Sequence, residues 1–151
     1  MFKFLLVAAL VPAMALASIT FRECPNEAPT PSLLTVNDCE GEVCEMTAGA
    51  PVQAMAYGIV SPVDSATATA YVIVRLGGLD VGFEIPPELV DACAVGIQEG
   101  CPLSSGVAFS YQLIDDSLDV PARGVAVEIE VGLTGDGGVA LGCVRFDAVI
   151  N

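Results

Sequence analysis

Six cysteines are the side chains in this sequence with the clearest chemistry. They stand at Cys24, Cys39, Cys44, Cys93, Cys101 and Cys143. Cysteines either oxidise to disulfides or bind a metal ion, and an even number in a secreted chain favours disulfides. Their spacing does not suit zinc, and the chain has no histidine to complete such a site. We therefore expect structural disulfides and no bound metal.

The lengths of the loops limit how these cysteines pair. Six cysteines allow fifteen pairings, and the sequence alone does not choose among them. Cys39 and Cys44 flank four residues, and Cys93 and Cys101 flank a seven-residue loop that contains two glycines. Both are natural short closures, which leaves the first and last cysteines to join the two ends of the domain. In the chain-entropy model a closure of that length contributes on the order of 4–5 kcal/mol.

The other reactive side chains do not form a catalytic set. The adjacent pair Asp115 and Asp116 falls in an expected turn, and Glu128 and Glu130 alternate outward on one expected strand. No serine can be activated in the usual way, because the chain lacks histidine. We expect no enzymatic activity and no cofactor.

Residues 1–17 have the pattern of a secretory signal peptide. Lys3 precedes a short apolar stretch. The small residues Ala15 and Ala17 lie three and one positions before Ser18, the expected first residue after cleavage. The stretch is shorter than the roughly 20 apolar residues of a membrane-spanning helix. We expect cleavage after Ala17 and a secreted, extracellular protein with one domain over residues 18–151.

The charge of the expected mature chain excludes several partners. Without the leader, four arginines stand against 19 acidic residues, a formal net charge of −15. Such a polyanion repels nucleic acid, so we expect no nucleic-acid binding. The chain has no Asn-x-Ser/Thr sequon, so an N-glycan tag for delivery to lysosomes is not expected. Secretion is therefore favoured, with lysosomal delivery as the alternative. We expect a monomer.

Short apolar segments separated by Gly, Pro, Asp and Ser predict an all-β sandwich of antiparallel strands. The clearest strand is 124–133, where aliphatic residues alternate with Glu128 and Glu130, which we expect to face water. Residues 144–150 alternate in the same way, with Phe146 and Ala148 inward, and 134–138 form the turn between the two strands. Residues 87–95 are expected to form a loop. Further strands are expected at 19–23, 33–38, 52–60, 67–76 and 107–113.

Several motifs occur in an order that resembles a known family. They are Cys39-x4-Cys44, the segment Gly82-Phe83-Glu84-Ile85-Pro86, Cys101-Pro102-Leu103, Phe109-Ser110-Tyr111, and a final Cys143. Together they resemble the ML lipid-recognition domains. The nearest branch is the secreted sterol-carrier group named for Niemann-Pick type C2, which includes arthropod homologues and mite group 2 allergens. The resemblance spans the whole expected mature chain.

The resemblance implies an immunoglobulin-like sandwich of two antiparallel sheets with a lipid in an internal apolar cavity. It implies the disulfides Cys24–Cys143, Cys39–Cys44 and Cys93–Cys101, the same pairing that the loop lengths favour. With the inward positions of the expected strand 124–133, it predicts a lipid pocket formed by aromatic and aliphatic side chains. The pocket residues expected are Phe83, Ile85, Phe109, Tyr111, Leu118, Val120, Val127 and Ile129.

Small residues on the expected strands have two interpretations. They could leave room for a ligand between the sheets, or they could let the sheets approach closely. The sequence favours neither. These residues are Ala54, Ala56, Ala66, Ala68, Ala70 and Ala126.

The expected function is a secreted carrier of a sterol or another neutral hydrophobic molecule, with transient contact to a membrane or receptor for hand-off of the ligand. The scarcity of basic residues disfavours a phosphorylated lipid. A fatty acid would require an arginine at the pocket mouth, for which Arg75 and Arg123 are candidates. The alternative is a secreted immunoglobulin-like recognition module, in innate immunity or semiochemical sensing, that binds a protein or amphiphile partner.

Overall fold

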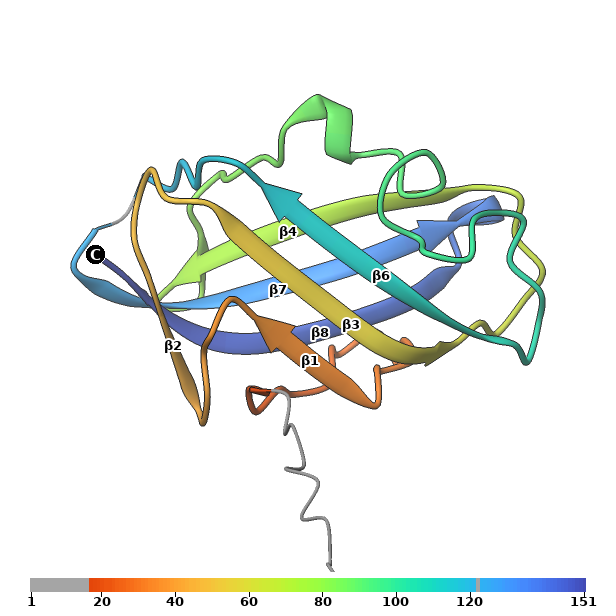
Figure 1. The fold of residues 1–151 in the computed structure, drawn as a ribbon, viewed down its shortest axis with the longest axis horizontal. Coiled ribbons are helices and arrows are strands. Elements are labelled where there is room, and N and C mark those ends of the chain that lie inside the picture. Colours follow the sequence, from red (N-terminus) through yellow and green to blue (C-terminus); the bar gives the residue numbers. More distant parts are fainter. Residues whose placement is uncertain (1–16, 122) are drawn as a thin grey trace, which may run out of the picture.

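Two β-sheets face each other in this protein (Figure 1). The computed structural model describes residues 17–121 and 123–151, so the expected signal peptide lies outside the described residues except for Ala17. One sheet has the strand order β1-β3-β6, and the other has the order β2-β8-β7-β4-β5. No helix in the described ranges is both long and apolar enough to cross a bilayer. The elements are β1 (Leu33–Val36), β2 (Val43–Met46), β3 (Val52–Val60), β4 (Ala68–Leu76), β5 (Leu79–Asp80), the 3₁₀ turn η1 (Pro87–Leu89), β6 (Ala108–Asp115), β7 (Val125–Gly135), η2 (Asp136–Gly138) and β8 (Ala140–Ile150).

The alternation of apolar and polar residues predicts the long strands well. β3 has the expected bounds, and β4 and β7 differ from the expected segments by one or two residues at an end. β8 begins at Ala140, four residues before the expected start, and β7 extends two residues into the expected turn. Val127 and Ile129 on β7 are buried between the sheets, as are Phe146 and Ala148 on β8. A period of two places every second side chain on the same face, so these residues form one wall of the core. The two-sheet, immunoglobulin-like sandwich is confirmed.

Some local predictions were wrong. Residues 19–23 do not form a strand and make only isolated bridges, from Ile19 to Gly41 and from Arg22 to Arg145. The short strand β2 was not expected, and it pairs with β8 in parallel, so the larger sheet is not wholly antiparallel. Only four residues long and containing Cys44, β2 offers too little alternation to be recognised from sequence.

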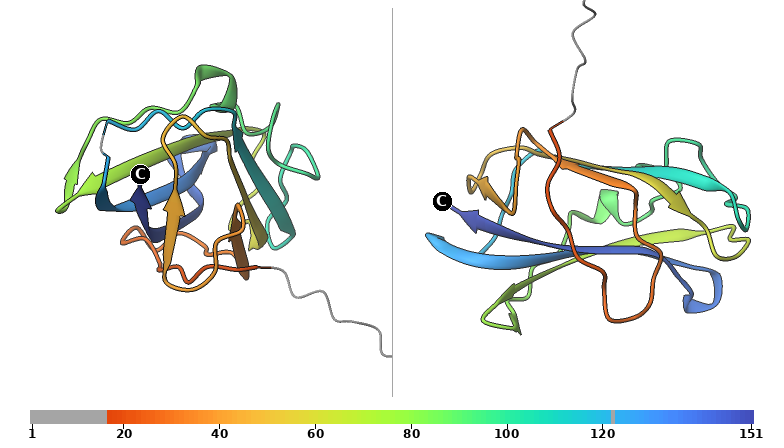
Figure 2. Two further views of the ribbon diagram at one scale, coloured as in Figure 1. Left: turned by 60° about the vertical axis from the view of Figure 1, so that its left-hand side comes forward. Right: turned by 90° about the horizontal axis from the view of Figure 1, so that it is seen from below.

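Three disulfides are present, with the pairing that the loop lengths and the resemblance favour. Cys24 is bonded to Cys143, and the separation of 119 residues makes this by far the longest closure. The other two close short loops, Cys39–Cys44 and Cys93–Cys101. The long bond anchors the segment before β1 to β8, and Figure 2 shows that this segment crosses the outer side of the larger sheet.

Glu130 does not face water, contrary to expectation. It points to the outer side of the larger sheet as predicted, yet the residue is only 6% exposed. The Tyr71 hydroxyl donates a hydrogen bond to Glu130 Oε2 at 3.1 Å, while Arg75 Nη1 and Arg145 Nε donate to Oε1 at 3.0 and 2.8 Å. The segment before β1 packs on the same side of this sheet, where Cys24 and Ala28 form a buried cluster with Cys143 and Tyr71. The alternation along a strand does not show that other segments will pack over an outward-facing side chain, which is why the prediction failed.

The environment of Glu130 makes stability depend on pH. Burial alone would raise the pKa of this carboxyl, but hydrogen bonds from Arg145, Arg75 and Tyr71 outweigh it and lower the pKa. A carboxyl whose pKa is lower in the folded state stabilises the fold above its unfolded pKa of about 4.3, and this contribution is lost as the pH falls through the folded pKa.

We therefore expect Glu130→Gln to lower the free energy of unfolding at neutral pH by about 2 kcal/mol. The deficit relative to wild type should shrink as the pH falls below the unfolded pKa of about 4.3 and through the lowered folded pKa, because the wild-type carboxyl group then also becomes neutral. Urea unfolding at neutral and acidic pH measures both effects. The exposed Glu42 offers a matched control, since Glu42→Gln should change stability by less than about 0.5 kcal/mol. A deficit of the same size at every pH would contradict this account of Glu130.

Candidate lipid site between the sheets

An apolar cavity lies between the two sheets, and both sheets contribute to its wall. Its volume is about 70 Å³. Most of the lining side chains are aliphatic or aromatic, as expected for the facing sides of a sandwich. The lining residues are Pro31, Leu34, Val36, Met46, Val52, Ala54, Ala56, Ile59, Val72, Val74, Phe83, Ile85, Tyr111, Leu113, Asp115, Leu118, Ile129, Val131, Gly132, Leu133, Gly142, Cys143, Val144 and Phe146.

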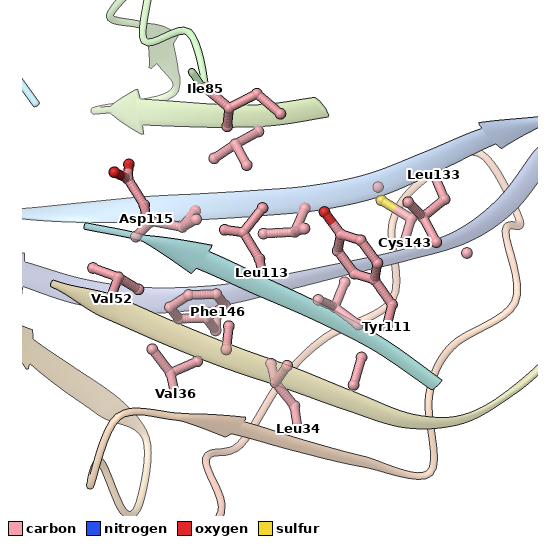
Figure 3. Close-up of a pocket in the computed structure, with 18 of the residues that line it drawn as sticks. Leu34, Val36, Val52, Ile85, Tyr111, Leu113, Asp115, Leu133, Cys143 and Phe146 are labelled. Carbon is pink, nitrogen blue, oxygen red and sulfur yellow. The ribbon is translucent and has the colours of Figure 1, made fainter. Parts of the chain in front are cut away.

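The two polar side-chain groups of this wall lie apart along β6. Figure 3 shows Tyr111 towards Leu133 and Cys143, whereas Asp115 lies near the other end, towards Ile85. Asp115 follows Tyr111 by four residues on β6, and four residues of a strand span roughly 13 Å. The wall between these groups is apolar, and Leu113 stands midway between them.

β6 is held in place by the loop that the Cys93–Cys101 disulfide closes. The Gln112 N–H donates to the Gly96 carbonyl at 2.9 Å, and the Gln98 N–H donates to the Ser110 carbonyl at 3.0 Å. Gly96 has a φ of +121°, and a Cβ there would lie 2.6 Å from the Tyr111 ring. Only glycine therefore fits against this face of the tyrosine. Burial raises the pKa of Tyr111, so its hydroxyl keeps its proton at neutral pH.

Two irregular segments complete the wall near Asp115. In the first, Phe83 and Ile85 both line the cavity while Glu84 between them is exposed. In the second, Leu118 is fixed by two backbone hydrogen bonds: its carbonyl accepts from the Gly49 N–H at 2.8 Å, and its N–H donates to the Ala50 carbonyl at 2.9 Å. The turn between β2 and β3 is thereby joined to the chain that follows β6.

The structure brings together five of the eight residues predicted to form the pocket. Phe83, Ile85, Tyr111, Leu118 and Ile129 line the cavity. The remaining three are buried in the core but are not part of the cavity wall: Phe109, Val120 and Val127.

Four of the six alanines divide between the two interpretations, whereas Ala66 and Ala126 are exposed and fit neither. Ala54 and Ala56 line the cavity, so their small side chains contribute to the open volume. Ala68 and Ala70 are buried outside the wall, where they let neighbouring elements approach closely.

Asp115 does not lie in the turn expected from the sequence, and that prediction was wrong. It is the last residue of β6, it is 7% exposed, and its side chain lines the cavity. The signal was the alternation of inward residues at Phe109, Tyr111 and Leu113, which Asp115 continues by one step. A charged residue at the end of an apolar alternation is usually assigned to the following turn, and here the strand includes it.

The paired acids do not form a catalytic arrangement in the described chain. Asp115 faces the cavity whereas Asp116 is exposed. Glu128 and Glu130 are held in ion pairs on the other side of the larger sheet, where both contact Arg75 and Arg145. Arg75 therefore does not line the cavity, and neither does the exposed Arg123. The basic residue that would recognise a fatty acid is missing from the described wall.

Comparisons with known proteins agree with this geometry. The family model described as ML domain matches residues 18–150. A solved structure with a similar fold is the crystal structure of a Niemann-Pick type C2 protein from the Japanese carpenter ant. The two chains superpose with a TM-score of 0.72 and 19% sequence identity, over 87% of this chain and 99% of that one. No curated protein sequence matches the chain.

Proposed function

The chain belongs to the ML domain family, and on that premise we propose that it is a secreted lipid carrier holding a sterol or another neutral hydrophobic molecule between its two sheets. The observation that carries the proposal is the cavity, which is lined from both sheets by apolar side chains. An apolar cavity with few polar groups is the usual form of a site for a hydrophobic small molecule.

The cavity has to widen when it takes up a ligand of this size. Its volume of about 70 Å³ is below the roughly 300–1,000 Å³ of typical small-molecule sites. No strand of β1-β3-β6 is paired with a strand of the five-stranded sheet. The sheets can therefore move apart at the cost of side-chain contacts, without breaking the hydrogen-bonded ladder within either sheet.

Binding would be driven mainly by removing the ligand from water. Burying roughly 300–400 Å² of apolar surface at about 25 cal/mol/Å² contributes on the order of 8–10 kcal/mol before the costs of ordering and of separating the sheets. Even after substantial costs, micromolar affinity is within reach. The shape of the widened cavity would then determine much of the choice of lipid.

Several features support a carrier that works outside the cytosol. Three disulfides are typical of secreted proteins. Release of a buried lipid requires the end of the cavity to open at an acceptor, so we propose a transient contact with a membrane or receptor during hand-off. The apolar wall is consistent with binding rather than catalysis as the role of this site.

Native mass spectrometry of the protein secreted by eukaryotic cells expressing the full chain, followed by organic extraction, tests the function. We expect a bound mass that extracts as a neutral lipid. If no lipid is present, the delipidated protein should take up a fluorescent sterol or fatty alcohol during titration. Failure of both experiments would contradict the carrier function and favour a recognition module that uses its surface.

A further inference from the structure

We infer that Asp115 selects the head group of the ligand. The cavity takes an alcohol, either a long-chain alcohol or a sterol, whose hydroxyl donates a hydrogen bond to the Asp115 carboxylate, and it discriminates against fatty acids. The inference rests on the lipid-carrier function proposed above. It goes further because it names a residue that sets the chemical class of the ligand.

The side chain of Asp115 has unused capacity to accept hydrogen bonds. Its Oδ1 accepts from the Ser117 N–H at 3.1 Å, the one hydrogen bond to this carboxylate within residues 17–121 and 123–151. An ionised carboxylate offers about four acceptor positions. The described residues contain no fully buried side-chain oxygen that lacks a partner, so Asp115 Oδ2 keeps surface that a donor can reach. A donor on the ligand would occupy one of these free acceptor positions.

Asp115 makes no ion pair with the arginines of the described chain. The six ion pairs there involve Arg22, Arg75 and Arg145, and all six are made to Glu128, Glu130 or Asp147. That cluster lies on the outer side of the larger sheet, away from the cavity. The Asp115 carboxyl group therefore faces the space between the sheets without an ion pair.

An acidic side chain at this position makes some head groups of the ligand more favourable than others. A hydroxyl donates a hydrogen bond and carries no charge that must be removed from water. An ammonium group also donates, but burying its charge adds a large desolvation cost. A fatty acid would place a second carboxylate beside the first, and the exposed Asp116 and Asp119 add further negative charge nearby. The alcohol is thus the favoured ligand.

The position of Asp115 also orients the ligand. With its hydroxyl at Asp115, the apolar body of the ligand would extend along β6, past Leu113 and towards Tyr111. These positions share one face of the strand, so their side chains contact the same ligand.

Matched lipids with one C18 chain and different head groups test the inference. Oleyl alcohol, oleyl methyl ether and oleic acid can each compete with the fluorescent probe N-phenyl-1-naphthylamine for delipidated wild-type protein at about pH 8. Loss of a hydrogen bond to a charged group lowers affinity by roughly ten- to hundredfold. We expect the alcohol to bind at least about tenfold more tightly than the ether, which has no donor, and than the ionised acid.

Two substitutions assign this preference to Asp115. Asp115→Asn removes the charge but keeps an oxygen for the Ser117 N–H, so the fold should be maintained, which thermal unfolding checks. In this variant the acid should gain affinity and the preference for alcohol over acid should fall to within about threefold. Asp116→Asn makes the same change of charge on the exposed neighbour, and it should keep the wild-type preference.

The outcomes separate this inference from the function on which it rests. Equal binding of alcohol, ether and acid by wild type would overturn the inference and leave the carrier function intact, as would a preference that Asp115→Asn does not change. An equal loss of preference in Asp116→Asn would show a general effect of surface charge and would also overturn it. Failure of wild type to bind any of the three lipids, or a sterol, would overturn both.

Discussion

Ala56→Phe is expected to abolish lipid uptake while leaving the sandwich folded. Ala56 lines the cavity from β3 and is paired with Tyr111 of β6 in the smaller sheet. A phenyl ring at this position would occupy most of a cavity of about 70 Å³. We expect affinity for a fluorescent sterol or fatty alcohol to fall roughly a hundredfold, while any overpacking costs about 1–3 kcal/mol of stability.

The same substitution on the outer side of the sandwich provides the control. Ala126 lies on β7 with its side chain exposed and outside the cavity wall, so Ala126→Phe should bind lipid like wild type. Fluorescence titration of both variants, with circular dichroism to confirm the fold, makes the comparison. Unchanged binding by a folded Ala56→Phe variant would show that the lipid does not enter the space between the sheets.

Removal of the Cys24–Cys143 disulfide is expected to cause the largest loss of stability. The bond closes 119 residues of chain, and in the chain-entropy model such a closure contributes about 5 kcal/mol. It also holds the segment before β1 against β8, on the side of the sheet where Glu130 is buried. Because domains of this size are stable by only about 5–15 kcal/mol, replacing both cysteines by alanine should remove a large part of that stability.

The short disulfide serves as the matched control for the long one. Cys39 and Cys44 lie five positions apart in the sequence, and the same model assigns their bond about 2 kcal/mol. Denaturant unfolding of the two double-alanine variants should therefore show a much larger deficit for Cys24/Cys143. Equal deficits would mean that loop closure is not the main contribution of the long bond.

Local patterns in the sequence predicted the sandwich and much of its wall. The alternation along 124–133 and 144–150 placed Ile129 and Phe146 between the sheets, because the period of a strand fixes the side on which each residue lies. The spacing of the cysteines favoured the pairing that the structure contains. The motif around Phe83 and Ile85 supplied two residues of the cavity wall from a segment that has no strand.

Contacts between distant segments were decided only by the tertiary structure. Glu130 has the sequence context of an exposed residue, yet it is buried because Tyr71, Arg75 and Arg145 converge on it from neighbouring strands. Asp115 faces the cavity because β6 continues to this residue, supported along its edge by the loop that contains Gly96.

The sequence by itself determined the fold class, the two short disulfide loops and the apolar character of the cavity, since these depend on residue type and short-range spacing. Only the tertiary structure decided which side chains share the cavity and where a charge lies inside it. The reason is physical: burial and compensation of a charge depend on every segment that packs around it, and those segments come from distant parts of the chain.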